Sequence, residues 1–162
     1  MTKMTAEEAN TFLKGAFETQ DNRSEVVSME DGRAVMRLVA DSSHLRPGGY
    51  ISGPTQMALV DSAAYMAVMT KTGHEPMTVT SNLSINFLRP CIGDVVVADA
   101  RIMKIGQALA VMEDRFGWKR EENSRWEVVE GRLILDGMTD QEPANNPRVW
   151  PDRYFPPADL SA

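Results

Sequence analysis

The stretch "HLRPGGYISGPTQMALVDSAAYMAV", residues 44–68, decides how the chain folds, because it changes abruptly from a loop into an apolar segment. Glycine and proline crowd its first part, and both residue types favour turns over regular structure. Beyond Pro54, which suits the first turn of a helix, no helix-breaking residue occurs until Gly73. The pattern predicts a helix over residues 54–71.

This predicted helix is apolar nearly all the way round. A helix exposed on one side would need apolar residues only on the other, so we expect most of its surface to be covered. One carboxylate, Asp61, interrupts the apolar residues, which are Met57, Ala58, Leu59, Val60, Ala63, Ala64, Met66, Ala67, Val68 and Met69.

The segments on either side predict an α+β fold with one antiparallel sheet. Apolar residues three and four apart predict a short amphipathic helix over about 5–19. Alternating residues around the Asp31-Gly32 turn predict a hairpin of strands 24–30 and 33–40. Stretches rich in β-branched and aromatic residues predict four more strands, at 77–88, 95–105, 108–118 and 125–137.

A single long apolar helix among such strands suggests that the sheet curls around the helix and buries it. The expected domain is one unit over residues 1–137, since a chain of 162 residues is too short for two ordinary domains. Residues 138–162 are rich in proline and lack periodicity, and we expect an irregular tail there.

Composition excludes several classes of partner. The formal net charge is −6 and no block of lysine and arginine is present, so neither nucleic acid nor a membrane surface is expected as a partner. Cys91 is the only cysteine, and without a cysteine or histidine cluster we expect no metal and no organic cofactor. The first residues show no apolar targeting segment, which predicts a cytoplasmic protein.

Asp61 requires an explanation, because burying an ionised carboxylate without a partner is costly. One interpretation places Asp61 on a small polar stripe that touches solvent or a second subunit. The other is suggested by the glycine-rich loop, where free amides of Gly53 and Thr55 at the helix start attract negative charge. Asp61 lies eight residues after Gly53, about 12 Å along a helix. Amides that polarise a carbonyl and an acid that activates water together suit acyl transfer.

The runs "GGYISGPTQMALVDSAA" (48–64) and "TVTSNLSINFLRPCIGD" (78–94), together with the order of elements, resemble the hotdog-fold acyl-CoA thioesterases. The resemblance is to their PaaI-like branch, related to phenylacetate-pathway and 4-hydroxybenzoyl-CoA thioesterases, and it covers about residues 35–137. It implies a hotdog fold, in which an antiparallel sheet wraps around one long central helix.

The loop matches the family motif His-x-Asn-x-x-Gly-x-x-His-Gly-Gly only in part. The matching positions are His44, Gly49 and Gly53, followed by the acid Asp61, whereas Arg46, Ser52 and Pro54 stand where asparagine, histidine and glycine are usual. The resemblance implies that the Gly53 amide polarises the thioester carbonyl and that Asp61 is a general base or a nucleophile. Whether Arg46 and Ser52 replace the usual side chains remains open at this point.

The resemblance also implies a role for Thr80, which would reach the site from a neighbouring subunit and position water opposite Asp61. A β-branched residue chosen for its strand is the alternative interpretation. The implied catalytic set is therefore Asp61, Gly53 and Thr80, and the implied substrate-binding set is His44, Arg46, Gly49, Ser52 and Asn82. Asn82 belongs to the polar face of the strand predicted at 77–88, which lines either a substrate channel or solvent.

The leading functional hypothesis is hydrolysis of acyl-CoA thioesters. The alternative is a non-catalytic acyl-CoA binding protein of the same fold, because three motif positions differ. A sheet that wraps one helix leaves an edge and an open side, so we expect a homodimer that pairs again into a dimer of dimers. The acyl group itself is not fixed by the sequence.

Overall fold

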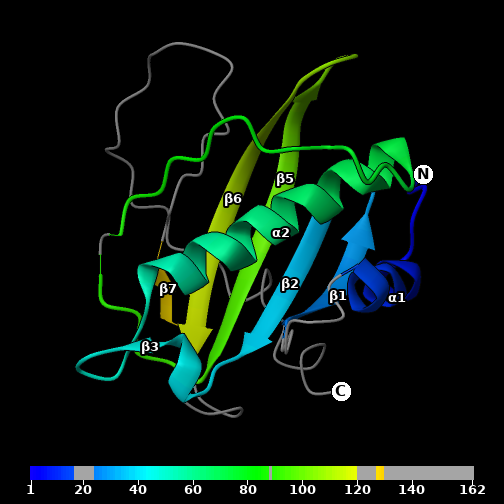
Figure 1. Ribbon diagram of the computed structural model, residues 1–162. Helices are drawn as coiled ribbons and strands as arrows, with labels where there is room; N and C mark the ends of the chain where they lie inside the picture. The colour runs from blue at the N-terminus through cyan, green and yellow to red at the C-terminus, as the bar shows by residue number, and fades with distance from the viewer. Residues whose placement is uncertain (17–23, 88, 120–126, 130–162) are drawn as a thin grey trace.

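The computed structural model describes residues 1–16, 24–87, 89–119 and 127–129 (Figure 1). Within them, five strands form one antiparallel sheet in the order β1-β2-β5-β6-β7. The strands are β1 (Ser24–Glu30), β2 (Arg33–Val39), β5 (Val95–Ile105), β6 (Ala110–Lys119) and β7 (Glu127–Val129). A small second sheet pairs β3 (Leu45–Arg46) with β4 (Tyr50–Ile51), next to the 3-10 helix η1 (Ser42–His44).

Helix α2 (Gly53–Thr72) lies across one face of the large sheet, and the short α1 (Ala6–Ala16) lies beside β1 (Figure 1). The core forms between α2 and the sheet, where Met36 of β2 and Met66 and Met69 of α2 are fully buried. Truncating a buried methionine of this kind to alanine typically costs about 2–5 kcal/mol. The predicted class, an antiparallel sheet with a long central helix and a short N-terminal helix, is confirmed.

Local signals explain where both helices begin and end. Thr5 and Glu8 form a reciprocal capping pair before α1, because the Thr5 amide donates to the Glu8 carboxylate (2.8 Å) and the Glu8 amide donates to the Thr5 hydroxyl (3.3 Å). Ser52 caps the start of α2, and Gly73 ends it with a φ of 83°, which favours glycine. Asn10 docks α1 on the sheet by two hydrogen bonds with the Val26 backbone.

A buried threonine ties two segments to the end of α2. The Thr70 hydroxyl accepts from the Gly32 amide at the β1–β2 turn (2.9 Å), and the Thr70 carbonyl accepts from the Lys3 amide near the N-terminus (2.7 Å). The same hydroxyl donates to the Ala67 carbonyl within the helix (2.6 Å). The N-terminal segment and the first hairpin are thereby fastened to α2.

The strand predicted at 77–88 is wrong for the described residues 77–87, in which only Ser84 makes an isolated bridge. This segment instead returns alongside α2 as an irregular chain toward β5 (Figure 1). Leu83 and Ile85 pack against the core while Asn82, Ser84 and Asn86 stay exposed. The alternation of apolar and polar residues was therefore real, but a strand also needs a continuous ladder with a neighbour, and in the described residues 77–87 only Ser84 makes a bridge.

The other predicted elements agree with the structure within a few residues where they are described. The short β3–β4 hairpin and η1 were not predicted. Residues 17–19 of the first predicted helix, most of the strand predicted at 125–137 and the whole predicted tail 138–162 lie outside the described residues. None of the helices in the described residues has the length and apolar character needed to cross a membrane.

Candidate active site

The start of α2 leaves one backbone amide available for a ligand. The Ser52 hydroxyl accepts from the Thr55 amide (3.2 Å), and the Ser52 carbonyl accepts from the Gln56 amide (3.1 Å). Pro54 has no amide hydrogen. The Gly53 amide has no partner in the described part of the chain, so Gly53, and not Thr55, is the donor at this helix end.

Gly53 lies directly under an aromatic ring from the segment that follows α2. A Cβ atom at position 53 would approach the Phe87 ring to 3.4 Å. Glycine therefore allows the ring to lie close to the backbone that carries the available amide. Phe87, which we did not single out in the sequence, is itself half exposed and lies beside the start of α2.

Asp61, two turns along α2, is partly buried and has a single described partner. The Thr80 hydroxyl donates to its Oδ1 at 2.5 Å, a length typical of a hydroxyl bound to a carboxylate. The resemblance implied a Thr80 from a neighbouring subunit, and within the single chain the contact is made by the chain's own Thr80. The contact fixes one oxygen of Asp61 and leaves the other for a further donor.

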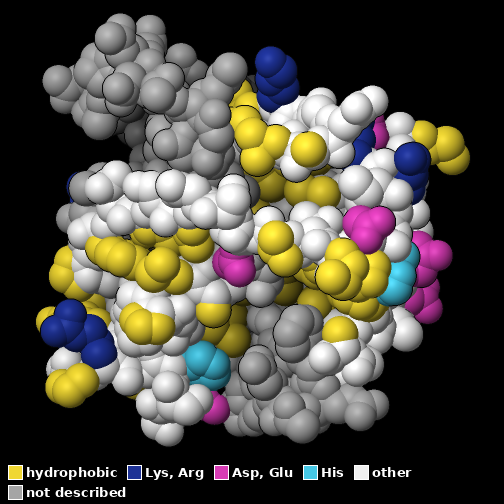
Figure 2. Space-filling model, turned by 45° about the horizontal axis from the view of Figure 1, so that its top comes forward, with side chains coloured by type: hydrophobic (Ala, Val, Ile, Leu, Met, Phe, Trp, Pro, Cys, Tyr) yellow, Lys and Arg dark blue, Asp and Glu magenta, His cyan; other side chains and the backbone are white. Residues whose placement is uncertain are grey.

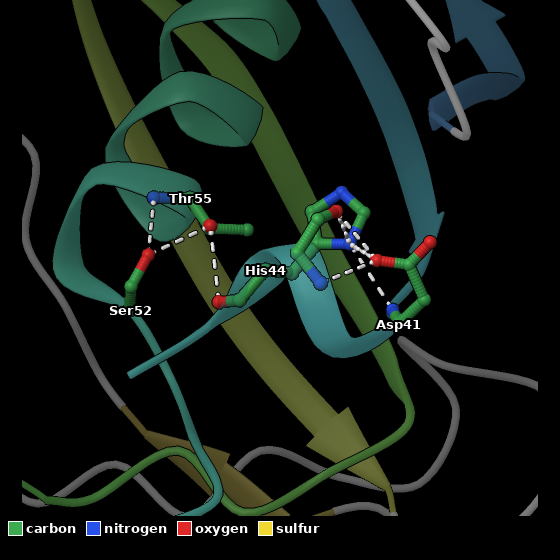
Figure 3. Close-up of polar contacts among 5 residues, drawn as sticks. Asp41, His44, Ser52 and Thr55 are labelled. Atoms are coloured by element: carbon green, nitrogen blue, oxygen red, sulfur yellow. Dashed lines mark hydrogen bonds and ion pairs between the residues drawn. The ribbon is translucent and has the colours of Figure 1, made fainter. Parts of the chain in front are cut away.

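His44 and Asp41 form a close pair beside the start of α2 (Figure 3). Nδ1 of His44 lies 2.9 Å from the Asp41 carboxylate and 3.1 Å from the Asp41 amide. The Asp41 carboxylate also accepts from the Ser43 amide (2.8 Å) and so caps η1. The His44 carbonyl accepts from the Ser52 amide (2.9 Å) and from the Thr55 hydroxyl (3.3 Å), which fastens His44 to the helix start.

Two predicted substrate-binding residues lie in the β3–β4 hairpin. Arg46 pairs with Tyr50 across the hairpin, and the Gly49 amide donates to the Arg46 carbonyl (3.1 Å). Gly48 and Gly49 both have positive φ, 97° and 77°, which explains why this turn needs glycine. Both Arg46 and Gly49 are exposed. The hairpin leads directly into Ser52 and thereby sets the direction in which the Gly53 amide points.

The remaining predicted site residues divide into two groups. Ser52 uses its hydroxyl as the helix cap and in a contact with the Thr55 hydroxyl (2.8 Å). Asn82, two residues after Thr80, is exposed on the segment that runs beside α2. The structure thus brings His44, Ser52 and Gly53 together at the start of α2, and it brings Thr80 to Asp61.

A second acid lies beneath α2 and was missed in the sequence. Asp114 of β6 is 1% exposed, and neither carboxylate oxygen has a hydrogen-bond partner among the described residues. Burial, reinforced by the charges of Asp99, Asp61 and Glu113, raises the pKa of Asp114 to about 8. The signal was present, because Met112 and Phe116 place Asp114 on the apolar face of an alternating strand.

In the described residues no group of three or more acidic, cysteine or histidine side chains is placed to hold a metal ion. Cys91 is buried, and burial raises the pKa of its thiol to about 12. A thiol of that kind is not a nucleophile at neutral pH. The polar groups that the structure places along the first half of α2 and beside its start are the Gly53 amide, Asp61 with Thr80, and the His44–Asp41 pair.

Comparison with known proteins agrees with this arrangement. Residues 48–116 match the thioesterase superfamily. A proposed esterase of Saccharolobus solfataricus is 29% identical over 91 residues, which are 56% of this chain and 64% of that protein. The chain thus spans somewhat less than two thirds of that relative.

Solved structures show the same fold. A proposed thioesterase from Silicibacter sp. TM1040 has a TM-score of 0.68 and 27% identity, over 83% of this chain and 91% of the other. Zebrafish thioesterase superfamily member 2 has a TM-score of 0.65 and 21% identity, over 82% and 99% of the two chains. The E. coli PaaI protein from the phenylacetic acid degradation operon has a TM-score of 0.61 and 21% identity, over 80% and 91%.

Residues 48–116 are therefore similar to the thioesterase superfamily, and the fold is that of the hotdog thioesterases. The resemblance deduced from the two sequence runs is confirmed. The matched residues include the glycine-rich loop, α2 with Asp61, and the segment that carries Thr80.

Proposed function

We propose that the protein hydrolyses acyl-CoA thioesters to the free acid and coenzyme A. The observation that carries this proposal is the pairing along one helix of an available amide at Gly53 with a partly buried acid at Asp61 held by Thr80. The match of residues 48–116 to the thioesterase superfamily supports the same reaction class.

In the proposed reaction the thioester carbonyl oxygen accepts a hydrogen bond from the Gly53 amide. Negative charge develops on this oxygen in the transition state, and a fixed donor at a helix start stabilises such charge. A hydrogen bond of about 2.9 Å holds the carbonyl carbon close to the amide, whereas Asp61 of the same chain is about 12 Å away along the helix. In the homodimer that we propose, the carboxylate, or a water bound to it, therefore reaches that carbon from Asp61 of the second subunit.

Asp61 is the general base or the nucleophile. As a base it takes a proton from water while the water oxygen bonds to the carbonyl carbon and the carbon–sulfur bond breaks. As a nucleophile it forms an anhydride that water then hydrolyses. The Thr80 hydroxyl occupies one carboxylate oxygen and so orients the other toward the reacting carbon in either case.

The acyl group would lie against the apolar surface around Asp61. Figure 2 shows hydrophobic side chains gathered in patches on one face of the molecule, interrupted by single acidic ones. The exposed large hydrophobic residues near the start of α2 and on the segment after it are Tyr50, Met57, Val79 and Phe87. These side chains suit an aromatic or a medium-length aliphatic acyl group, and they do not distinguish between the two.

A panel of acyl-CoA thioesters, assayed by the release of free thiol, tests the proposal. We expect turnover to fall about a hundredfold or more in Asp61→Asn, the scale of losing a general base, with substrate binding changed far less. Turnover should survive dialysis against a chelator, since we propose no metal or organic cofactor. The matched control is Asp31→Asn, which changes an exposed acid that pairs with Lys71 at the far end of α2.

A protein that binds acyl-CoA without hydrolysing it is the alternative. The departures from the family motif at Arg46, Ser52 and Pro54 favour it, and the presence of Asp61 counts against it. Near-normal turnover in Asp61→Asn, or binding of acyl-CoA without any thiol release by the unaltered protein, would make the binding protein the better proposal.

A further inference from the structure

Asp114 is a buried acid that lies beneath the helix carrying Asp61. In the sheet it is the register partner of Ala100, and it shares a face of β6 with Met112 and Phe116, which belong to the core under α2. Its side chain is 1% exposed, and neither of its oxygens has a hydrogen-bond partner in the described part of the chain. Because an unpartnered charge in such a place is costly, Asp114 carries a proton.

Asp61 acts on this buried acid from the helix side. Helix α2 packs against β5 and β6. Burial is the main cause of the raised pKa of Asp114, and the negative charge of Asp61 adds to it. The other charges that act on Asp114 are also negative: Asp99 of β5, which pairs with Arg33 (2.8 Å), and the adjacent Glu113 of β6. Asp61 and Asp114 are therefore electrostatically coupled across the layer between helix and sheet.

The surroundings of the two acids favour opposite charge states. Asp61 is partly exposed, and its Oδ1 accepts a hydrogen bond from the Thr80 hydroxyl, which favours the ionised form. Asp114 is buried and lacks a donor among the described residues, which favours the protonated form. Two carboxyl groups whose surroundings separate them in this way take different roles in an acid–base site.

We propose that Asp61 and Asp114 act as a carboxyl pair that carries one proton, and that thioester hydrolysis requires the pair in this form. The inference rests on the proposed function and adds Asp114 as a positioning residue that acts through Asp61. With Asp61 as the base, the water oxygen bonds to the carbonyl carbon, a water proton goes to Asp61, and the carbon–sulfur bond breaks. The departing thiolate then takes the proton from Asp61 through solvent, while Asp114 keeps its own proton throughout.

The position of Asp61 depends on the proton of Asp114, because both lie at the contact between α2 and β6. An ionised Asp114 would have to be solvated, so water would enter beneath α2 or the helix would move. Either change displaces Asp61, and a misplacement of about 1 Å in a catalytic group can slow a reaction about a hundredfold. We therefore expect the reaction to slow as Asp114 loses its proton.

The pH dependence of kcat tests this requirement. With a pKa of about 8, the protonated fraction of Asp114 falls from about nine tenths at pH 7 to about one tenth at pH 9. We expect kcat on a saturating acyl-CoA thioester to fall about tenfold over the same range. In Asp114→Asn, whose amide cannot ionise, kcat at pH 7 and at pH 9 should be nearly equal. Glu7→Gln, which alters an exposed acid of α1, is the control and should keep the tenfold fall.

Titration of the Asp114 carboxyl carbon, followed by NMR in protein that contains carbon-labelled aspartate, tests the pair without any substrate. We expect Asp61→Asn to lower the pKa of Asp114 by about one pH unit, because this change removes a like charge. Glu7→Gln should leave the pKa of Asp114 unchanged. Circular dichroism at pH 7 and pH 9 checks that each protein stays folded.

Three results would overturn the inference while leaving the proposed hydrolysis in place. They are an equal kcat at both pH values in the unaltered protein, an alkaline loss that persists in Asp114→Asn, and an Asp114 titration that does not respond to Asp61→Asn. If the unaltered protein cleaves no acyl-CoA thioester, the proposed function is wrong. The carboxyl titration then still decides whether Asp61 and Asp114 form a pair.

Discussion

The carboxyl group of Asp114 is the buried polar group for which the described residues offer no hydrogen-bond partner. It extends from β6 toward α2, among side chains that also include Met112 and Phe116. A charged carboxylate could not persist in such surroundings, so the residue holds its proton, in keeping with a pKa of about 8. The consequence is a stability that depends on pH.

We predict that the free energy of unfolding falls as the pH rises from about 4 to about 8. In this window the unfolded chain releases the Asp114 proton, because its ordinary pKa is 3.8, while the folded chain must keep it up to a pKa of about 8. The slope from one such group is about 1.4 kcal/mol per pH unit. Asp114→Asn should remove this slope and make the variant relatively more stable at pH 8 than at pH 5.

Urea unfolding of the protein and of Asp114→Asn at both pH values measures this difference. Glu7→Gln, which alters an exposed acid in the first turn of α1, is the control and should leave the slope in place. Parallel stability curves for the protein and Asp114→Asn would mean that the carboxylate finds a partner in solution.

Sequence reasoning identified Asp61 but not Asp114 or Asp41, and the reason is physical. Asp61 interrupts a helix that is apolar on every side, so its burial follows from helical periodicity alone. The burial of Asp114 could be predicted only after the residues of its strand had been assigned to the two faces of the sheet. The partnership of Asp41 with His44 depends on the path of η1, a three-residue turn that no periodic pattern predicts.

At the scale of elements, the Ser52 side chain at the start of α2 has a structural role where a substrate-binding role was expected. The Ser52 hydroxyl caps the helix, and an N-cap serine is worth about 1 kcal/mol of stability. We therefore predict that Ser52→Ala lowers the free energy of unfolding by about 1 kcal/mol with little change in KM. Ser52→Asp, which keeps a capping oxygen, should restore the stability.

Thermal unfolding and steady-state kinetics of the unaltered protein, Ser52→Ala and Ser52→Asp separate the capping role of the hydroxyl from a role in substrate binding. A raised KM in Ser52→Ala without any loss of stability would assign the hydroxyl to substrate binding instead.

The strands and helices could be predicted where their own periodicity determines them. The boundaries of β1 and β5, Ser24–Glu30 and Val95–Ile105, are those expected from the sequence. The segment 77–87 could not be predicted in the same way, because its alternation sets which side chains face the core but not whether a neighbouring strand is present. The intrachain contact between Thr80 and Asp61 followed from that irregular path.

At the scale of the whole molecule, we propose that the protein is a homodimer that pairs again into a dimer of dimers. Tyr50, Met57, Val79 and Phe87 expose apolar side chains on β4, on α2 and on the segment that follows α2, and exposed apolar side chains of this size are found at interaction sites. Because these side chains lie near the candidate site, the substrate would bind at the boundary between the subunits of the proposed dimer.

We predict that Val79→Glu shifts the protein toward the monomer and lowers turnover together with it, since a charge at an apolar interface is costly. Multi-angle light scattering at micromolar concentration measures the mass. Thr78→Glu, at the neighbouring and less exposed position, tests whether the effect depends on the exposed apolar face. A stable monomer for the unaltered protein would refute the proposed assembly.

The hydrogen bonds of Thr70 link regions that are far apart in the sequence, and this has a consequence for amide hydrogen exchange. The amides of Lys3 and Gly32 both donate hydrogen bonds to Thr70. A local opening that exposes one of these amides should therefore also change the exchange rate of the other. In Thr70→Val the Gly32 amide loses its acceptor while the Lys3 amide keeps a backbone carbonyl. Exchange at Gly32 should then accelerate most, exchange at Lys3 should accelerate to a smaller extent, and the Val26 amide held by Asn10 should keep its rate.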